Sequence, residues 1–330
     1  MKKSFIFAII LWFAAILVTE GCVSPRVKLF NQAPEPFHEE VLSGTGPGKI
    51  LMIPISGIIS DHPHKGLVST KPGMVQDIVS QLDLAARDKD IKAVLLKINS
   101  PGGTVTASDI IYHEIMEFKK KTGDKVVAVM MNVAASGGYY IALSADHIIA
   151  HPSTVTGSVG VIFMRPQISG LMNKIGVDVA VSKSGKNKDM GSPFRPGTKE
   201  EDKLFQDLTD KLGKRFVSLV KKRRHLNAKQ LAEIKTARIF LAFDAKNYGL
   251  IDTIGYMDDA VKQCVRLAGL PETAEVVVYR RTTWPDDNLY NSQQMINGAL
   301  PSLIDPGLPG YMTRPVSGFC YLWTPGIETP

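Results

Sequence analysis

The sequence predicts an α/β fold with a mainly parallel sheet and flanking helices. From Ile50 onward, apolar segments of strand length alternate with amphipathic segments of helical periodicity, as in strand–helix–strand units. Two apolar segments run directly into glycine-rich turns, Pro101-Gly-Gly103 and Ser136-Gly-Gly138. The composition, 44% hydrophobic and 22% charged over 330 residues, fits a globular protein of one large or two modest domains plus a membrane-directed segment.

Each element follows from the spacing of apolar residues. Short continuous apolar runs predict strands, and apolar residues that recur every three or four positions predict helices. The expected strands cover 50–55, 93–98, 126–131, 147–150 and 159–162. The expected helices cover 74–87, 108–120, 138–143, 199–222, 242–248 and 257–267. The apolar positions of the helix at 199–222 favour a core or oligomer face over a cofactor site.

The N-terminus is typical of an export signal. Lys2 and Lys3 precede an apolar run over 5–18, which is short for a spanning helix of about 20 residues. Thr19-Glu-Gly-Cys22 then resembles a bacterial lipoprotein cleavage site, so Cys22 is a lipidation candidate. Lipidation and an uncleaved anchor remain alternatives, and in both cases the bulk of the chain is exported.

We therefore expect four regions. They are a signal peptide or membrane anchor over 1–22, a linker over 23–48, a globular domain over 49–270 and an irregular C-terminal arm over 271–330. The linker and the end of the arm are rich in proline and glycine.

Charge and cysteine content exclude several classes of protein. The net charge of +7 is spread along the chain without a recognisable nucleic-acid-binding module, and the basic run at 221–225 is expected to be a solvated helix end. The widely separated Cys22, Cys264 and Cys320 do not form a zinc site. Two buried thiols at Cys264 and Cys320 are favoured over a disulfide. We expect no metal and no other cofactor.

The two glycine turns supply the parts of an acyl-transfer site. Such a site needs a nucleophile and N–H donors for the tetrahedral oxyanion. Ser136 is the candidate nucleophile, and the N–H groups of Gly103 and Gly137 are the candidate donors, because strand ends in parallel sheets collect at one edge. The alternative for Ser136 alone is ordinary helix capping.

A serine nucleophile also needs a base. None of the seven histidines lies in a context that suggests one, and Ala134 replaces the first glycine of a Gly-x-Ser-x-Gly turn. A lysine can serve where burial keeps it neutral. Lys188 lies in a glycine-rich polar stretch over 183–195, for which a solvated lysine is the alternative.

Several motifs in order resemble a known family. They are Asn99-Ser-Pro-Gly-Gly103, Ala134-Ala-Ser-Gly-Gly-Tyr-Tyr140, Thr156-Gly-Ser-Val-Gly160, Lys183-Ser-Gly-Lys-Asn-Lys188-Asp-Met-Gly-Ser-Pro193 and Gly249-Leu-Ile-Asp252. Together they resemble the bacterial signal peptide peptidase A family, serine–lysine peptidases of the ClpP/crotonase fold. The resemblance covers roughly 50–270, and Thr236-Ala-Arg238 departs from the Asp-Gly-Arg often found there.

The resemblance implies a role for each matching residue. Ser136 matches the family nucleophile, Lys188 its general base, Gly103 and Gly137 the oxyanion donors, and Ser158 the hydroxyl that orients the lysine. Family members form membrane-anchored rings in which adjacent subunits can share catalytic groups. They cleave signal-peptide remnants and need no metal or nucleotide.

The prediction is a membrane-associated serine endopeptidase that cleaves short apolar peptides, with signal-peptide remnants as substrates. It would lie at a bacterial inner membrane, with the catalytic domain on the extracytoplasmic side and a homo-oligomeric ring as the assembly. One alternative is a non-catalytic, membrane-tethered scaffold of the same fold. Another is an enzyme related to acyl-CoA hydratases, against which the export signal argues because coenzyme A is cytoplasmic.

Overall fold

A computed structural model describes residues 36–65, 70–281 and 319–323. The chain divides into two compact units, Met1–Ala33 and Pro34–Pro330, and all described residues belong to the second. The predicted export signal and Cys22 therefore lie outside the described residues. Among the residues described, no helix is both long and apolar enough to cross a membrane.

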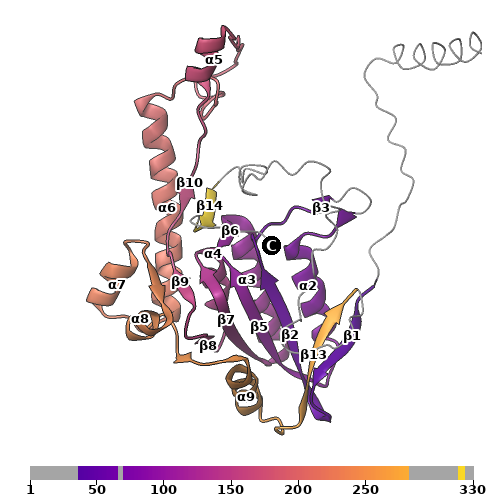
Figure 1. Ribbon diagram of the computed structural model, residues 1–330. Coiled ribbons are helices and arrows are strands. Elements are labelled where there is room, and N and C mark those ends of the chain that lie inside the picture. Colours follow the sequence, from indigo (N-terminus) through magenta and orange to yellow (C-terminus); the bar gives the residue numbers. More distant parts are fainter. Residues whose placement is uncertain (1–35, 66–69, 282–318, 324–330) are drawn as a thin grey trace, which may run out of the picture. The chain divides into compact units, whose positions relative to one another are not determined.

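A nine-stranded, mostly parallel sheet forms the centre of the fold (Figure 1). Its main path runs β1-β13-β2-β5-β7-β8-β12, and β9 and β11 continue from the end of β7. The strands are β1 (His38–Ser43), β2 (Gly46–Ser56), β5 (Ile91–Ser100), β7 (Lys125–Ala135), β8 (His147–Ala150), β9 (Val155–Gly157), β11 (Ile239–Leu241), β12 (Thr253–Ile254) and β13 (Ala274–Arg280). Only β1 and β11 pair antiparallel within it. This confirms the predicted fold class.

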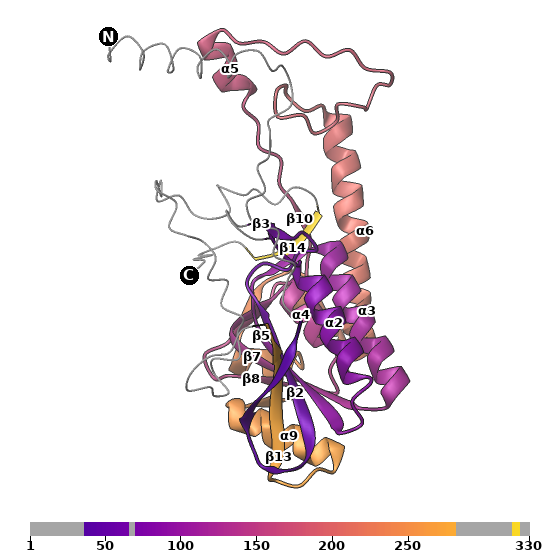
Figure 2. The same ribbon diagram turned by 90° about the vertical axis from the view of Figure 1, so that its right-hand side faces the viewer.

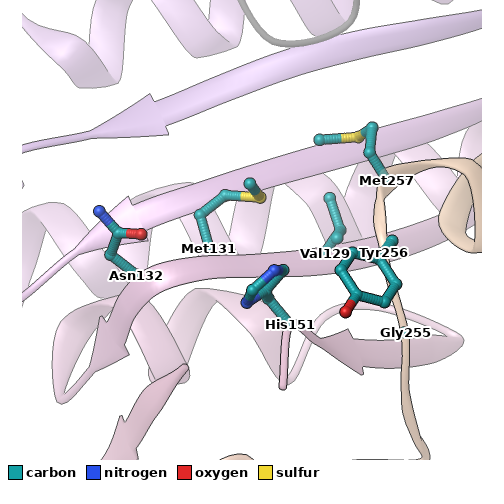
Figure 3. Close-up of a pocket in the computed structure, with 7 residues that line it drawn as sticks. All are labelled: Val129, Met131, Asn132, His151, Gly255, Tyr256 and Met257. Carbon is teal, nitrogen blue, oxygen red and sulfur yellow. The ribbon is translucent and has the colours of Figure 1, made fainter. Parts of the chain in front are cut away.

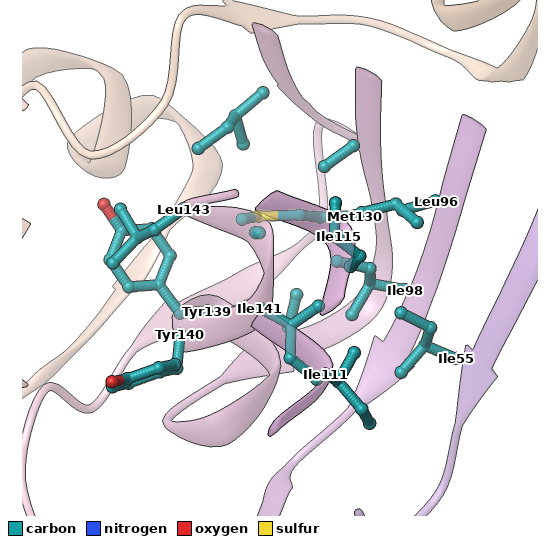
Figure 4. Close-up of a cluster of buried hydrophobic side chains, with 14 of the residues drawn as sticks. Ile55, Leu96, Ile98, Ile111, Ile115, Met130, Tyr139, Tyr140, Ile141 and Leu143 are labelled. Carbon is teal, nitrogen blue, oxygen red and sulfur yellow. The ribbon is translucent and has the colours of Figure 1, made fainter. Parts of the chain in front are cut away.

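Helices cover both faces of the sheet because side chains alternate along each strand. Leu51 and Ile53 of β2 belong to the core under α2 (Met74–Ala85), α3 (Val105–Thr122) and α4 (Gly137–Ala142). Their neighbours Ile50 and Met52 belong to a second core under α9 (Met257–Ala268). Figure 2 shows α2 and α3 covering one face, and Figure 4 shows Ile141 of α4 and Met130 of β7 within the first core.

The remaining helices lie between β10 and β12 in sequence. They are α5 (Ser169–Ile175), α6 (Lys199–Arg223), α7 (Ala228–Ile234) and α8 (Ala242–Asn247). A capping box between Thr198 and Glu201 starts α6. At its other end, Arg223 donates to the carbonyl of Leu143, and Arg224 pairs with Asp252. The basic run at 221–225 is thus only partly the solvated helix end that we expected, because its arginines fasten α6 to the core.

Two smaller sheets complete the fold. One has the order β10-β14-β6, with β10 (Ile162–Phe163), β14 (Phe319–Leu322) and β6 (Gly102–Thr104). The other pairs β3 (His64–Lys65) with β4 (Thr70–Lys71). The strand predicted over 159–162 was misplaced: the structure has β9 before it and β10 at its end.

The sheet extends past both edges of the region expected to be globular. β1 lies inside the stretch 23–48 that we expected to be a linker, and β13 lies inside the expected irregular arm, 271–330. β13 pairs with both β1 and β2, which explains its buried Val-Val-Val run. Cys264 on α9 and Cys320 on β14 are both buried thiols, as the sequence favoured.

Candidate active site

Ser136 occupies the sharp turn between β7 and α4. Its backbone angles, φ 53° and ψ −114°, lie in a sparsely populated region for a residue with a side chain. The turn is held because the Ser136 N–H donates to the carbonyl of Gly157 at 2.8 Å. Ser136 is the N-cap residue of α4, yet its side chain makes no capping hydrogen bond. The capping alternative therefore does not explain this serine.

The hydroxyl of Ser136 is buried and unused. The residue is only 1% exposed, and among the described residues its Oγ has no hydrogen-bond partner. Buried polar groups in folded proteins are nearly always paired, so an unpaired hydroxyl needs an explanation. A strained backbone and an unpaired Oγ at one residue favour a nucleophile whose partners arrive with substrate or with another chain.

The glycine turn after β5 brings a second backbone against Ser136. A Cβ added to Gly137 would lie 3.1 Å from the nitrogen of Gly103, and one added to Gly102 would lie 2.8 Å from the nitrogen of Gly137. Gly102 also has φ +107°, which favours glycine. The N–H groups of Gly103 and Gly137 are therefore neighbours beside Ser136, as an oxyanion site requires.

Side chains buried below the turn fix its shape. Ser100 Oγ donates to the carbonyl of Gly57 at 2.6 Å and accepts from the Gly102 N–H at 3.1 Å. Asn99 Oδ1 accepts from the N–H of Val133 at 3.2 Å, which ties the end of β5 to the end of β7. The Asn-Ser-Pro-Gly-Gly motif thus builds the turn with its polar residues, and Ser100 takes up the Gly102 N–H.

Ser158 lies alongside Ser136. Ala135 of β7 pairs with Gly157 of β9 in a parallel ladder, and Ser136 and Ser158 are the residues that directly follow this pair. Ser158 has φ 51° and is 9% exposed, and its N–H donates to the carbonyl of Arg238 at 2.9 Å. The structure thus brings together four of the five residues that the motifs single out.

Lys188 is the fifth, and it lies elsewhere. It is exposed, in the segment between α5 and α6. The adjacent Asp189 accepts from Lys183 and Arg195, and these bonds hold the pKa of its carboxyl well below the usual range. Arg195 also binds Glu201 in the first turn of α6. The lysine-bearing segment is therefore fastened to the N-terminal end of α6.

The length of α6 separates the Lys188 segment from the Ser136 turn. The axial rise from Glu201 to Phe216 is about 22 Å at 1.5 Å per residue. The ring of Phe216 packs on that of Tyr140, with centroids 4.9 Å apart. Tyr140 follows Ser136 closely in the chain. Figures 1 and 2 show the N-terminal end of α6 beside α5, away from α4. A single chain therefore does not bring Lys188 to Ser136.

An aromatic cluster beside the turn was missed by sequence reasoning. Its members are Tyr112, Tyr140, Phe216 and Tyr321. Tyr140 Oη donates to Asp109 at 2.5 Å; burial, and then this bond, raise the pKa of the phenol. The Tyr-Tyr pair that follows Ser-Gly-Gly was the available signal, but the partners come from three other elements.

A hollow lies beside β7, on the face that α9 covers (Figure 3). It is lined by Val129, Met131, Asn132, His151, Gly255, Tyr256 and Met257. The imidazole of His151 makes a hydrogen bond with Ser153 Oγ at 2.8 Å and an edge contact with the ring of Tyr256. This hollow contains none of the expected site residues. Within 36–65, 70–281 and 319–323, no cluster of His, Cys, Asp or Glu could hold a metal ion.

A strained serine at a strand end, beside two glycine N–H groups in a parallel α/β fold, is the arrangement of a serine peptidase. Comparison with known proteins agrees. Residues 118–271 match the model of peptidase family S49, and residues 68–156 match that of Clp protease. The chain belongs to peptidase family S49, the family of the SppA proteins, and is a serine peptidase.

Individual relatives show how far the similarity extends. The chain is 36% identical over 256 residues to the "Putative signal peptide peptidase SppA" of Enterococcus faecium, covering 78% of this chain and 74% of that protein. It is 34% identical over 243 residues to Protease 4 of Haemophilus influenzae, but this covers only 38% of that longer protein. A mutant ClpP1 of Listeria monocytogenes aligns with a TM-score of 0.41 at 20% identity, covering 63% of this chain and 93% of that one.

Proposed function

We propose that this protein is a membrane-associated endopeptidase in which Ser136 and Lys188 form the catalytic dyad. The observation that carries the proposal is the buried, unpaired Oγ of Ser136, held in a strained turn beside the N–H groups of Gly103 and Gly137. Its substrates are short apolar peptides in extended conformation, and signal-peptide remnants are the class that fits best.

The chemistry needs only these groups and water. Neutral Lys188 Nζ takes the proton of Ser136 Oγ, and Oγ attacks the scissile carbonyl carbon. The oxyanion that forms accepts from the Gly103 and Gly137 N–H groups. The lysine then gives its proton to the leaving amine, which departs and leaves an ester on Ser136. Lys188 next deprotonates a water that attacks the ester, and the returning proton restores the Ser136 hydroxyl.

The lysine comes from a neighbouring copy of the chain. The segment that carries Lys188 has unpartnered apolar side chains: Leu171 and Ile175 are 61% and 65% exposed, and Val177, Val179 and Val181 are each about half exposed. A second apolar patch, Leu241 and Phe243, is 57% and 68% exposed. Two different patches that pair head to tail form a closed ring when the rotation closes.

The second patch lies where a visiting lysine is needed. β11, which carries Leu241, pairs with β9, and the next residue after β9 is Ser158. A neighbour's segment docked on this patch places its Lys188 beside Ser158 and Ser136. Docking also buries the lysine, and burial disfavours the charged form of an amine.

The location follows from the N-terminal segment. The predicted export signal places the catalytic domain on the extracytoplasmic side of a bacterial inner membrane, held by a lipidated Cys22 or by an uncleaved anchor. The printed name of the Enterococcus faecium relative, a signal peptide peptidase, supports signal-peptide remnants as the substrate class.

Peptidase assays on an apolar reporter peptide test the dyad. Ser136→Ala and Lys188→Ala should each lower kcat/KM by at least about 10³-fold with an unchanged circular dichroism spectrum. Lys186→Ala is the matched control, because Lys186 lies in the same exposed segment and pairs with Glu200. Activity within tenfold of wild type in Lys188→Ala would remove the lysine from the mechanism. A wild-type protein whose Ser136 does not react with a fluorophosphonate would be the non-catalytic scaffold instead.

A further inference from the structure

The turn between α7 and β11 ends against the candidate active site. The carbonyl of Arg238 accepts from the N–H of Ser158 at 2.9 Å. This bond lies one step beyond Gly157 and Ile239, which pair in the antiparallel ladder of β9 and β11. Residues far from Ser158 in the chain therefore hold the backbone of the residue whose hydroxyl is expected to orient the lysine.

This turn also shares an unusual backbone conformation with the site. Within 36–65, 70–281 and 319–323, only Ser136, Ser158 and Ala237 combine a side chain with a positive φ, and the φ of Ala237 is 58°. Such angles are disfavoured for residues with a Cβ, and they persist where the surrounding structure enforces them, often at functional sites. Ala237 has no reactive group of its own, so its strain points to the shape of the turn.

Contacts at both ends hold the turn in this shape. At its start, the N–H of Ala237 donates to the carbonyl of Ile234 at 3.0 Å. At its end, the guanidinium of Arg238 lies over the ring of Phe240, 4.7 Å from the ring centroid, and pairs with Glu233 at 3.4 Å. Ile234 and Phe240 are both buried, so the turn is fastened to the core on either side.

Ala237 and Arg238 press on the segment around Ser158 at two points. A Cβ added to Gly160 would lie 2.8 Å from the Cβ of Ala237, so the methyl group of Ala237 leaves no room for a side chain there. A Cβ added to Gly157 would lie 2.9 Å from the carbonyl oxygen of Arg238. The N–H of Gly160 donates in turn to the carbonyl of Ser158 at 2.9 Å. Ser158 is therefore flanked by two glycines whose backbones contact this turn.

We propose that Ala237 and Arg238 are positioning residues for peptide cleavage, which set the place and direction of the Ser158 hydroxyl. This inference rests on the proposed function. The methyl group of Ala237 and the carbonyl of Arg238 act on the backbone around Ser158 and need not touch substrate. The hydroxyl of Ser158 then accepts an N–H of the visiting Lys188, which turns the lone pair of the amine toward Ser136.

Gly160→Ala in the full-length protein tests the contact. The new methyl group would meet that of Ala237 at 2.8 Å, and Gly160 does not have a positive φ, so the clash is the main effect. We expect kcat for an apolar reporter peptide to fall at least tenfold, with KM within twofold of wild type and a nearly constant melting temperature. Gly213→Ala on α6 is the control, because its methyl group meets open space among the described residues.

Removing the methyl group of Ala237 should undo the effect. Gly160→Ala combined with Ala237→Gly has room for the new methyl group, and glycine adopts a positive φ without strain. The kcat of this pair should return to within threefold of that of Ala237→Gly alone. Failure of the pair to recover, or a normal kcat in Gly160→Ala, would overturn the proposal. An unfolded Gly160→Ala protein would overturn it too, because the turn would then hold the fold and not the site.

A double-mutant cycle tests whether the turn acts through Ser158. A Ser158→Ala protein has no hydroxyl to position, so adding Gly160→Ala should lower kcat by less than a further twofold. A full tenfold loss in that background would contradict a positioning role. Wild-type activity in Ser158→Ala, with an inactive Ser136→Ala, would overturn this inference and leave the dyad intact. An active Ser136→Ala or Lys188→Ala enzyme would instead refute the proposed function, and this inference with it.

Discussion

The two halves of the proposed dyad are built in opposite ways. Ser136 sits where β7 ends, buried and fixed by the Gly157 carbonyl, with Gly103 and Gly137 packed backbone to backbone beside it. Lys188 sits in an exposed segment whose contacts are ion pairs, chiefly those of Asp189 and Arg195. Ion pairs near the surface hold a segment less rigidly than buried backbone packing does.

This difference separates two tasks that a single chain could have combined. The nucleophile and the oxyanion donors must hold their geometry to a fraction of an ångström, and the end of a parallel sheet provides that. The base has only to be present at the right moment. In the proposed mechanism, a lysine on an outward segment would make peptide cleavage depend on a neighbour and would protect each chain from its own serine until assembly.

Mixing two inactive variants tests whether the serine and the lysine of one site come from different chains. Ser136→Ala and Lys188→Ala chains, unfolded and refolded together, should recover about one quarter of wild-type activity, because in a ring with random order one interface in four joins an intact serine to an intact lysine. Each variant refolded alone is the control. No recovery in rings shown to be mixed by mass would place both groups in one chain.

Gly137→Ala tests the rigid turn that holds Ser136 and the oxyanion donors. The added methyl would lie 2.5 Å from Ser108 Oγ and 3.1 Å from the Gly103 nitrogen, so it should misplace an oxyanion donor. We expect kcat to fall about 10²-fold or more. Gly170→Ala is the control, because its methyl meets open space and its φ is not positive. A Gly137→Ala enzyme with normal kcat would show that this N–H is not a donor.

Arg195→Ala tests the segment that carries Lys188. This change frees Asp189 and Glu201 from their shared arginine and so loosens the segment that presents Lys188. We expect kcat/KM to fall about tenfold while the melting temperature stays nearly constant, since misplacement of a catalytic group costs rate. Lys203→Ala, on the exposed side of α6, should leave both unchanged. A large drop in melting temperature would mean that the arginine holds the fold.

A lysine buried in the sheet gives the smallest effect, on stability alone. Lys97 of β5 is 4% exposed, and burial lowers its pKa from 10.5 to about 8. Between pH 8 and about 10.4 the unfolded chain binds more protons than the folded one, so the unfolding free energy should rise with pH across this window. The rise should be about 1–3 kcal/mol. Lys97→Met should abolish it in denaturant titrations, whereas Lys92→Met, exposed on the same strand, should not.

The spacing of apolar residues predicted those strands and helices whose own sequence is enough to specify them. β8 was expected over 147–150 and α6 over 199–222, and the structure places them at His147–Ala150 and Lys199–Arg223. β1, β13 and α7 were missed because their sequences are short and their stability comes from partners distant in the chain. A strand such as β13 is recognisable only once β1 and β2 lie beside it.

The site divides along the same line. That Ser136 and Gly103 meet could be predicted, because strand ends of a parallel sheet converge at one edge. The position of Lys188 could not be predicted, because it depends on how the segment before α6 folds. There, Arg195 joins Asp189 of the segment to Glu201 of α6. The register that sets Tyr321 opposite Gly103 also has no local signal, since the two are 321 − 103 = 218 positions apart in the chain.

Helix α6 has a consequence for how this protein can change. The helix fixes the distance and direction of the Lys188 segment from the core. One residue inserted in α6 would turn that segment by about 100° and move it by about 1.5 Å. Under the proposed mechanism, such an insertion would move Lys188 out of line with the serine of a neighbour, so lengths that differ by whole turns would be tolerated best. Chains whose α6 helices differ in length could not complete each other's sites. The length of this one helix would then decide which chains assemble into an active enzyme.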